Sequence, residues 1–174
     1  MSENQKIQCQ DGDTFTVAGM EFIKFPSRNG GTPVVLKDIA FHSEFGNNND
    51  LRSSRILEKL EEEFLPKLIA AFGEENVQIF KTDLTTLDGL KPYGEMESRV
   101  SLVTLDFYRA NAEIFGKYKP GSWWWMATPD SAQPNAEPNW LLCVSPSGDI
   151  SGDSYDYGSG VRPFCILNSS IFES

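Results

Sequence analysis

The sequence predicts an α+β domain of short, mostly antiparallel strands with two main helices, and three observations support this class. Short β-branched and aromatic runs separated by turn residues recur along the chain, as is typical of antiparallel strands. Two other stretches carry apolar residues at helical spacing behind a residue that can cap a helix. All four tryptophans fall between Trp123 and Trp140, and such large side chains mark the structural centre of a domain.

Length and charge limit the number of domains and the kinds of binding partner. The 174 residues suit one domain, expected over residues 11–174 after a flexible N-terminus at residues 1–10. The formal net charge of -10 opposes nonspecific binding to nucleic acid phosphates and to anionic lipid. Since the first residues lack a signal-peptide pattern and no stretch approaches about 20 apolar residues, we expect a cytoplasmic protein with no membrane partner.

Strands are expected where β-branched or aromatic runs are bounded by turn residues. Ala18-Gly19 lies between two such runs and predicts a hairpin. A long exposed connection is expected over residues 83–97, because this stretch contains two turn dipeptides. The predicted strands are residues 14–17, 20–25, 33–41, 77–81, 100–103, 123–126, 140–144 and 161–167, with a short strand that begins at Asp149.

The two helices follow from capping residues and apolar stripes. The first begins after the serine pair at 53–54, and Pro66 either ends it or opens a second short helix that runs to Phe72. The second begins at Thr104 or Asp106. The apolar stripes are Ile56, Leu57, Leu60 and Phe64 in the first helix and Phe107, Ala110, Ile114 and Phe115 in the second.

The C-terminal third carries a family resemblance. Its segments are Trp123-Trp124-Trp125 with the following Met-Ala-Thr-Pro, the run 140–144, Ser-Gly-Asp-Ile at 147–150, and Gly-Val-Arg-Pro at 160–163. In this order they resemble the closing part of an uncharacterised domain family of gut bacteria and their phages, and the resemblance covers most of residues 14–167. That family is similar to C-type-lectin-like domains, including the sulfatase-modifying-factor type and the variable ligand-binding proteins of phage.

The resemblance implies a C-type-lectin-like fold and a recognition domain of phage or mobile-element origin, which could be associated with the virion. Fold alone does not settle function, which depends on the residues of the site.

No set of residues predicts catalysis. The single histidine, His42, has no accompanying nucleophile motif, and Ser159 in Gly-Ser-Gly lacks the strand-turn-helix context of a hydrolase nucleophile. Cys143 and Cys165 fall in predicted core strands, where free buried thiols are expected, although the two could be neighbours. We therefore expect a protein that is not an enzyme and has no catalytic residue.

Three aspartates, Asp149, Asp153 and Asp156, could supply oxygen ligands to calcium. Their spacing matches no calcium-binding loop, and aspartate in such a loop more often accepts hydrogen bonds from nearby backbone. The sequence predicts no metal and no cofactor, and it leaves calcium binding open.

The predicted binding surface consists of the loops at residues 129–139 and 151–160. The second loop combines tyrosine with small polar residues, the composition of antigen-binding loops, although a solvated hairpin tip is the simpler interpretation. Trp124 should face away from its two tryptophan neighbours and could form a platform for a sugar or peptide, unless it packs in the core. The candidate contacts to a protein or glycan are Asp153, Tyr155, Asp156, Tyr157, Asn135 and Trp124.

A second hypothesis uses the acidic residues of the first helix. Glu58, Glu61 and Glu62, with further glutamates at positions 63, 74 and 75, could imitate nucleic acid phosphates and occupy the basic groove of a host defence nuclease. The protein would then be an intracellular inhibitor of the anti-CRISPR kind.

Overall fold

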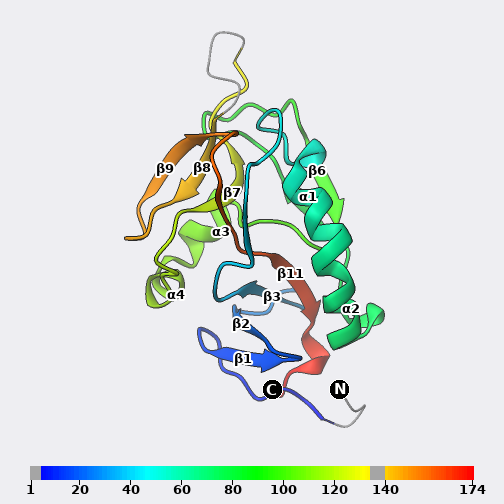
Figure 1. Cartoon of the computed structure of the whole chain (residues 1–174). Helices are drawn as coiled ribbons and strands as arrows, with labels where there is room; N and C mark the ends of the chain where they lie inside the picture. Colours follow the sequence, from blue (N-terminus) through cyan, green and yellow to red (C-terminus); the bar gives the residue numbers. More distant parts are fainter. Residues whose placement is uncertain (1–4, 134–139) are drawn as a thin grey trace.

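The computed structural model describes residues 5–133 and 140–174, in which the chain forms an α+β structure with mostly antiparallel strands (Figure 1). A four-stranded sheet has the order β1-β2-β3-β11, a five-stranded sheet has the order β4-β10-β7-β8-β9, and β5 pairs with β6. The strands are β1 (Thr14–Val17), β2 (Met20–Lys24), β3 (Gly31–Leu36), β4 (Phe41–Ser43), β5 (Phe80–Asp83), β6 (Glu95–Ser98), β7 (Trp124–Pro129), β8 (Trp140–Val144), β9 (Ile150–Ser154), β10 (Ser159–Val161) and β11 (Phe164–Asn168).

One main helix lies along the side of both large sheets (Figure 1). It consists of α1 (Arg55–Lys59), a π-helical turn (Leu60–Phe64) and α2 (Leu65–Phe72). Ser54 caps it by accepting a hydrogen bond from the Leu57 N–H at 2.9 Å. Pro66 lies in the first turn of α2, which corresponds to the second of the two predicted alternatives. Proline has no N–H, and its ring clashes with the preceding turn of a regular α-helix. The wider π turn therefore lets the main helix continue past Pro66.

The prediction of a second main helix is wrong. The expected segment forms two short helices, α3 (Leu105–Ala110) and α4 (Ala112–Lys117). Between them Asn111 leaves helical conformation with φ -125° and ψ 28°, and its side chain donates a hydrogen bond to the Phe107 carbonyl at 3.0 Å. The break lets Phe107 and Phe115 meet edge to face, with ring centroids 6.0 Å apart.

The predicted N-terminal hairpin is confirmed: β1 and β2 pair across Ala18 and Gly19, which both have positive φ. Other boundaries differ from the predictions. The strand expected over 33–41 is two strands, since β3 ends at Leu36 and β4 begins at Phe41. Residues 100–103 make only an isolated bridge, between Ser101 and Phe164. The connection expected over 83–97 contains β6, which closes a hairpin with β5.

The loop expected over 151–160 is largely strand, because β9 extends to Ser154 and β10 starts at Ser159. The strand expected over 161–167 is divided at Arg162-Pro163. Before this point β10 belongs to the five-stranded sheet, and after it β11 belongs to the four-stranded sheet. Proline has no N–H to donate to a strand partner, which suits a position where the chain leaves one sheet for another.

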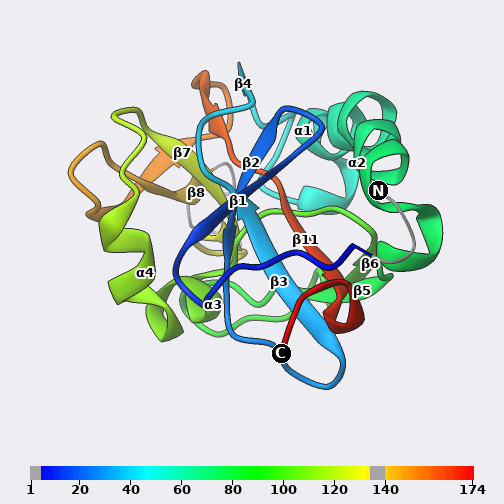
Figure 2. The same ribbon diagram turned by 90° about the horizontal axis from the view of Figure 1, so that it is seen from below.

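Both large sheets bury side chains on both faces. In β7, Trp125 contributes to a core on the side of the main helix, whereas Trp124 contributes to a second core on the side of α3 and α4. In β8, Cys143 belongs to the core on the main-helix side and Leu142 to the second core, because successive side chains of a strand point to opposite faces. Figure 2 shows α3 and α4 on the side of the sheets away from α1 and α2.

Arg162 connects the two sheets at the crossover. Its side chain is buried and donates hydrogen bonds to the carbonyls of Leu36, Lys37 and Tyr118 at 3.1, 2.7 and 3.4 Å. The guanidinium also lies over the Trp124 ring, 4.8 Å from its centroid. This charge is therefore held by backbone carbonyls and an aromatic face.

The segment expected to be flexible at residues 1–10 includes a docked part. Ile7 donates a backbone hydrogen bond to Ile171 at 2.8 Å and accepts one from Glu173 at 2.9 Å. These bonds attach the described start of the chain to its C-terminal end.

Candidate functional site

An open depression of about 500 Å³ lies beside the start of β7 in the five-stranded sheet and extends to the edge strand β9. Strand β4, the residues just before β7, strand β9 and the turn that joins β9 to β10 all contribute to it. We refer to it as the Trp123 depression, and its lining residues are His42, Ser122, Trp123, Asp153, Tyr157, Gly158 and Ser159. Segments more than 100 residues apart in sequence therefore meet at one surface.

Two aromatic rings of the depression face solvent. Trp123 is 41% exposed and Tyr157 is 59% exposed, whereas the next two tryptophans in the sequence, Trp124 and Trp125, are at most 2% exposed. Trp123 immediately precedes β7, so its ring lies outside the packed part of the sheet. Exposed aromatic rings offer a large contact area at low entropic cost, which is the property of residues at recognition surfaces.

Asp153 is the carboxylate of the depression, and its electrostatic environment is unfavourable. It is half-buried on β9, and its Oδ2 accepts a weak hydrogen bond from the Cys143 thiol at 3.9 Å. Within the described residues no Lys or Arg nitrogen forms a salt bridge with it. Burial raises the pKa of Asp153. A desolvated carboxylate without a cationic partner, set in a concave surface, is typical of functional sites.

The Cys143 thiol stays protonated beside this carboxylate. Burial raises its pKa to about 12, and the nearby Asp153 charge adds to the effect. Cys143 is a free thiol, as is the buried Cys165, which confirms the expectation of free buried cysteines. The thiol can therefore donate to Asp153 but does not supply a nucleophilic thiolate.

Serine, histidine and aspartate all line the depression, yet they do not form a catalytic relay in this geometry. Ser159 pairs with Ser43, while His42 pairs with Gly160 one position further along the same ladder. Directly paired residues share a face and successive residues alternate, so Ser159 and His42 point to opposite faces. Among the residues in the described ranges, no hydrogen bond joins the side chains of His42, Ser159 and Asp153.

The structure brings together two of the predicted contact residues, Asp153 and Tyr157. Tyr155 is half-buried against the core on the main-helix side, and its carbonyl accepts a hydrogen bond from the Phe45 N–H at 2.8 Å. Asp156 is exposed in the adjacent turn but does not line the depression. Asn135 lies outside the described residues.

The prediction of Trp124 as a ligand platform is wrong. Its side chain is 2% exposed because Arg162 covers one face and the rings of Tyr108 and Phe115 pack nearby. Trp124 and Trp125 lie on opposite faces of the strand, as its alternation predicts, and both of these faces are buried.

Three residues of the depression lie outside the predicted binding surface, Ser122, Trp123 and His42. The signal for Trp123 is its position after Pro120-Gly121 and before the strand, which leaves it at the strand's open end. His42 carries no such signal, because only the pairing of β4 with β10 brings it to the depression.

The acidic residues of the alternative hypothesis are at the surface. Glu58, Glu61 and Glu62 are all exposed along the main helix. The other three glutamates of that hypothesis are exposed as well, and Glu74 lies 3.5 Å from the Arg99 guanidinium.

Across residues 5–133 and 140–174, no group of three or more His, Cys, Asp or Glu side chains is placed to hold a metal ion. In the same part of the chain, no helix has both the length and the apolar character needed to cross a bilayer.

Comparison of the chain with protein-family models, with curated proteins and with solved structures found no match.

Proposed function

We propose that this chain is a non-enzymatic recognition domain that binds a glycan in the Trp123 depression. The observation that carries the proposal is the half-buried Asp153 carboxylate, without a basic partner among the described residues, in a surface that also exposes two aromatic rings. Ligand binding compensates for the unfavourable desolvation of such a group by supplying hydrogen-bond donors.

The chemistry of the depression suits a sugar. The Trp123 and Tyr157 rings can lie against the apolar C–H face of a pyranose. Asp153 can accept hydrogen bonds from sugar hydroxyls, and His42, on the exposed edge strand, can donate or accept. A volume of about 500 Å³ lies in the range of small-ligand sites. The C-type-lectin-like resemblance and a phage or mobile-element origin support the same proposal, and a protein loop is the competing ligand.

A glycan array tests this proposal, followed by titration with the best-bound sugar. Trp123→Ala and Asp153→Asn should each weaken binding by roughly tenfold or more, because each removes a contact at the centre of the site. Trp140→Ala is the matched control, since Trp140 is 39% exposed on β8 and does not line the depression. This control should bind like the unmodified protein.

The proposal fails if no glycan binds, or if binding is insensitive to Trp123→Ala and Asp153→Asn. If a protein partner were captured from host or phage lysate and its binding were lost in the same two variants, the depression would remain the binding surface but its ligand would be a protein and not a glycan.

A second candidate function is inhibition of a defence nuclease by the glutamates of the main helix. It is favoured by the exposure of Glu58, Glu61 and Glu62 along the main helix. Replacing these three with glutamine should abolish inhibition of a susceptible nuclease if their charges imitate phosphates, and inhibition by the unmodified protein should weaken with salt. Unchanged inhibition by the triple variant would exclude this mechanism.

A further inference from the structure

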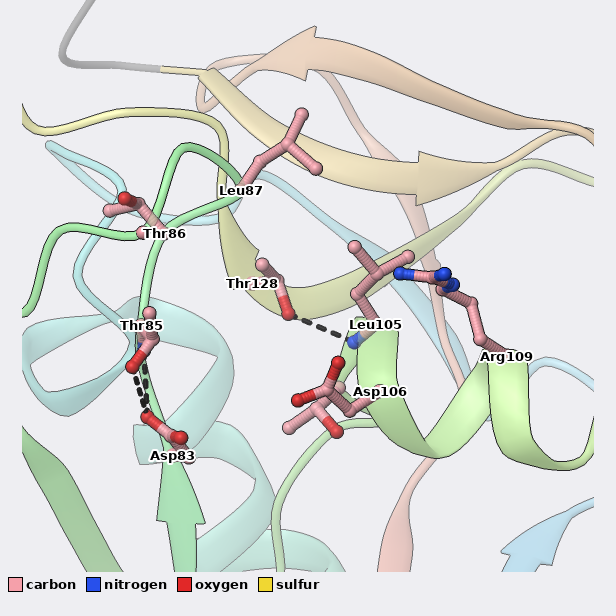
Figure 3. A pocket seen from close by; sticks show the side chains of 10 residues that line it. Asp83, Thr85, Thr86, Leu87, Leu105, Asp106, Arg109 and Thr128 are labelled. Atoms are coloured by element: carbon pink, nitrogen blue, oxygen red, sulfur yellow. Dashed lines mark hydrogen bonds between the residues drawn. The ribbon is translucent and has the colours of Figure 1, made fainter.

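A second pocket, of about 290 Å³, lies near the opposite end of β7 from the Trp123 depression. Its walls are the connection that follows β5, the start of α3, and Thr128 near the end of β7 (Figure 3). We refer to it as the Asp83 pocket. Thr128 accepts a hydrogen bond from the Leu105 N–H at 3.0 Å, which attaches the start of α3 to β7. The pocket therefore has two walls that are joined to each other.

The Asp83 carboxylate is held by hydrogen bonds that favour its charged form. Its Oδ1 accepts hydrogen bonds from the backbone N–H and the hydroxyl of Thr85, at 2.9 and 2.6 Å. These bonds favour the charged form and lower the pKa of Asp83. Figure 3 shows Asp106 on the facing wall, with its carboxylate directed toward the Asp83 side of the pocket. Two acidic groups thus face one space, an arrangement that suits a bound ammonium group with three donors.

Arg109 adds a positive charge at the edge of the same pocket. Figure 3 shows its side chain extending beside Leu105. No salt bridge joins its guanidinium to a carboxylate within the described ranges. A guanidinium matches a carboxylate in a bidentate geometry. The pocket therefore combines an anionic part and a cationic part.

Two leucines supply the apolar part of the wall. Leu105 and Leu87 both line the pocket, and Leu87 is 51% exposed. Exposed leucine beside charged groups gives a surface for an aliphatic group of a ligand.

We propose that the Asp83 pocket binds a free α-amino acid with an aliphatic side chain. The ligand ammonium lies between Asp83 and Asp106, the ligand carboxylate meets Arg109, and the aliphatic side chain covers Leu87 and Leu105. The inference is independent of glycan binding, because no residue is shared between the Asp83 pocket and the Trp123 depression.

Thermal unfolding and calorimetry of the full chain test the proposal, with L-leucine as the probe. Leucine at about 10 mM should raise the unfolding temperature, since a ligand that binds the folded state stabilises it. N-acetyl-leucine lacks the ammonium and leucinamide lacks the carboxylate, so each should bind roughly tenfold or more weakly than leucine.

Variants locate the site. Asp106→Asn and Arg109→Gln should each weaken leucine binding by roughly tenfold or more, as expected when one partner of a charge-assisted hydrogen bond is removed. Both residues are exposed, so the fold should tolerate these changes. Glu113→Gln is the matched control, because Glu113 is an exposed carboxylate on neighbouring α4 that does not line the pocket, and it should leave binding unchanged.

Three results would overturn the proposal. They are no binding of leucine, binding of butylamine as strong as that of leucine, and leucine binding that is insensitive to both Asp106→Asn and Arg109→Gln. The butylamine result would assign the pocket to simple ammonium ligands and leave Arg109 without a role.

Discussion

Trp123 and Trp125 are two residues apart, yet they belong to different regions of the molecule. Trp125 is in the interior of the five-stranded sheet, fully buried, with its Nε1 donating a hydrogen bond to the Ser43 carbonyl at 2.9 Å. Trp123 is at the open end of the same sheet and is 41% exposed. The difference shows that position relative to the end of a strand, and not residue type, decides whether a tryptophan stabilises the fold or can contact a ligand.

The same contrast holds for two charged residues of the C-terminal third. Arg162, in the interior, has three carbonyl acceptors and an aromatic face. Asp153, on the edge strand β9, has only a thiol donor among its side-chain partners in the described residues. A buried charge is tolerated when it has a full set of partners, whereas a half-buried charge without them costs stability.

The largest expected effect is the difference in stability between alanine variants of the two tryptophans. Trp125→Ala should lower the free energy of unfolding by about 3–5 kcal/mol, because it leaves a cavity and removes the hydrogen bond to Ser43. Trp123→Ala should lower it by less than about 1 kcal/mol. Urea unfolding followed by circular dichroism measures both values, and equal losses in the two variants would remove the distinction between interior and sheet end.

The next largest effect on stability is expected for Arg162→Met. Methionine keeps much of the apolar volume but leaves the carbonyls of Leu36, Lys37 and Tyr118 without their donor, so the unfolding free energy should fall by about 2–4 kcal/mol. Arg162→Lys retains a charge and should lose less. An unchanged unfolding midpoint for Arg162→Met would show that the crossover does not depend on this residue.

Asp153→Asn should change the free energy of unfolding in the opposite direction and by a small amount. Burial raises the folded pKa of Asp153 above the ordinary value of 3.8, so the ionised form is disfavoured in the folded state. The resulting cost is absent below that ordinary pKa, develops as pH rises from that value to the folded pKa, and is fully present at neutral pH. The variant should therefore be equal to or slightly more stable than the unmodified protein at pH 7, by less than about 1 kcal/mol.

Comparison of the unfolding midpoints at pH 7 and at pH 3 measures this effect. The advantage of the asparagine variant should shrink at the lower pH. A clear loss of stability at pH 7 would mean that Asp153 has a structural partner and would weaken its assignment to a binding site.

The smallest effect concerns thiol labelling, which should leave the folded structure unchanged. Burial raises the pKa of Cys143 and of Cys165 to about 12, whereas Cys9 is only half-buried. In folded protein at pH 8, a chromogenic disulfide reagent should label Cys9 first and the other two only after unfolding. Equal labelling rates for all three would contradict the burial of the sheet interior.

Local elements were predictable where local physics determines them. The positive φ values required at Ala18 and Gly19 suit the β1–β2 hairpin. The apolar run at residues 140–144 is a strand as expected and is buried except for its first residue, Trp140, which is 39% exposed. The break at Asn111 and the division of residues 161–167 were not predictable, because the first depends on packing of Phe107 against Phe115 and the second on which sheet each half joins.

The candidate site was predictable only in part. Composition pointed to Asp153 and Tyr157, since tyrosine and aspartate among small residues are typical of contact loops. The contribution of His42 depends on a strand pairing between segments more than 100 residues apart, which local patterns do not specify. The Asp83 pocket is of the same kind, because Asp83, Asp106 and Thr128 meet only in the folded chain.

The amino-acid sequence alone determined the α+β class, the helix and strand segments with strong periodicity, the acidic charge and the burial of most of strands β7 and β8. These follow from propensity, alternation and hydrophobicity, which act over a few neighbouring residues. The tertiary structure decided that Trp123 is exposed while Trp124 is covered by Arg162, and that Asp153 lacks a basic partner among the residues described. Exposure and charge pairing depend on which distant segments pack together, so only the assembled fold determines them.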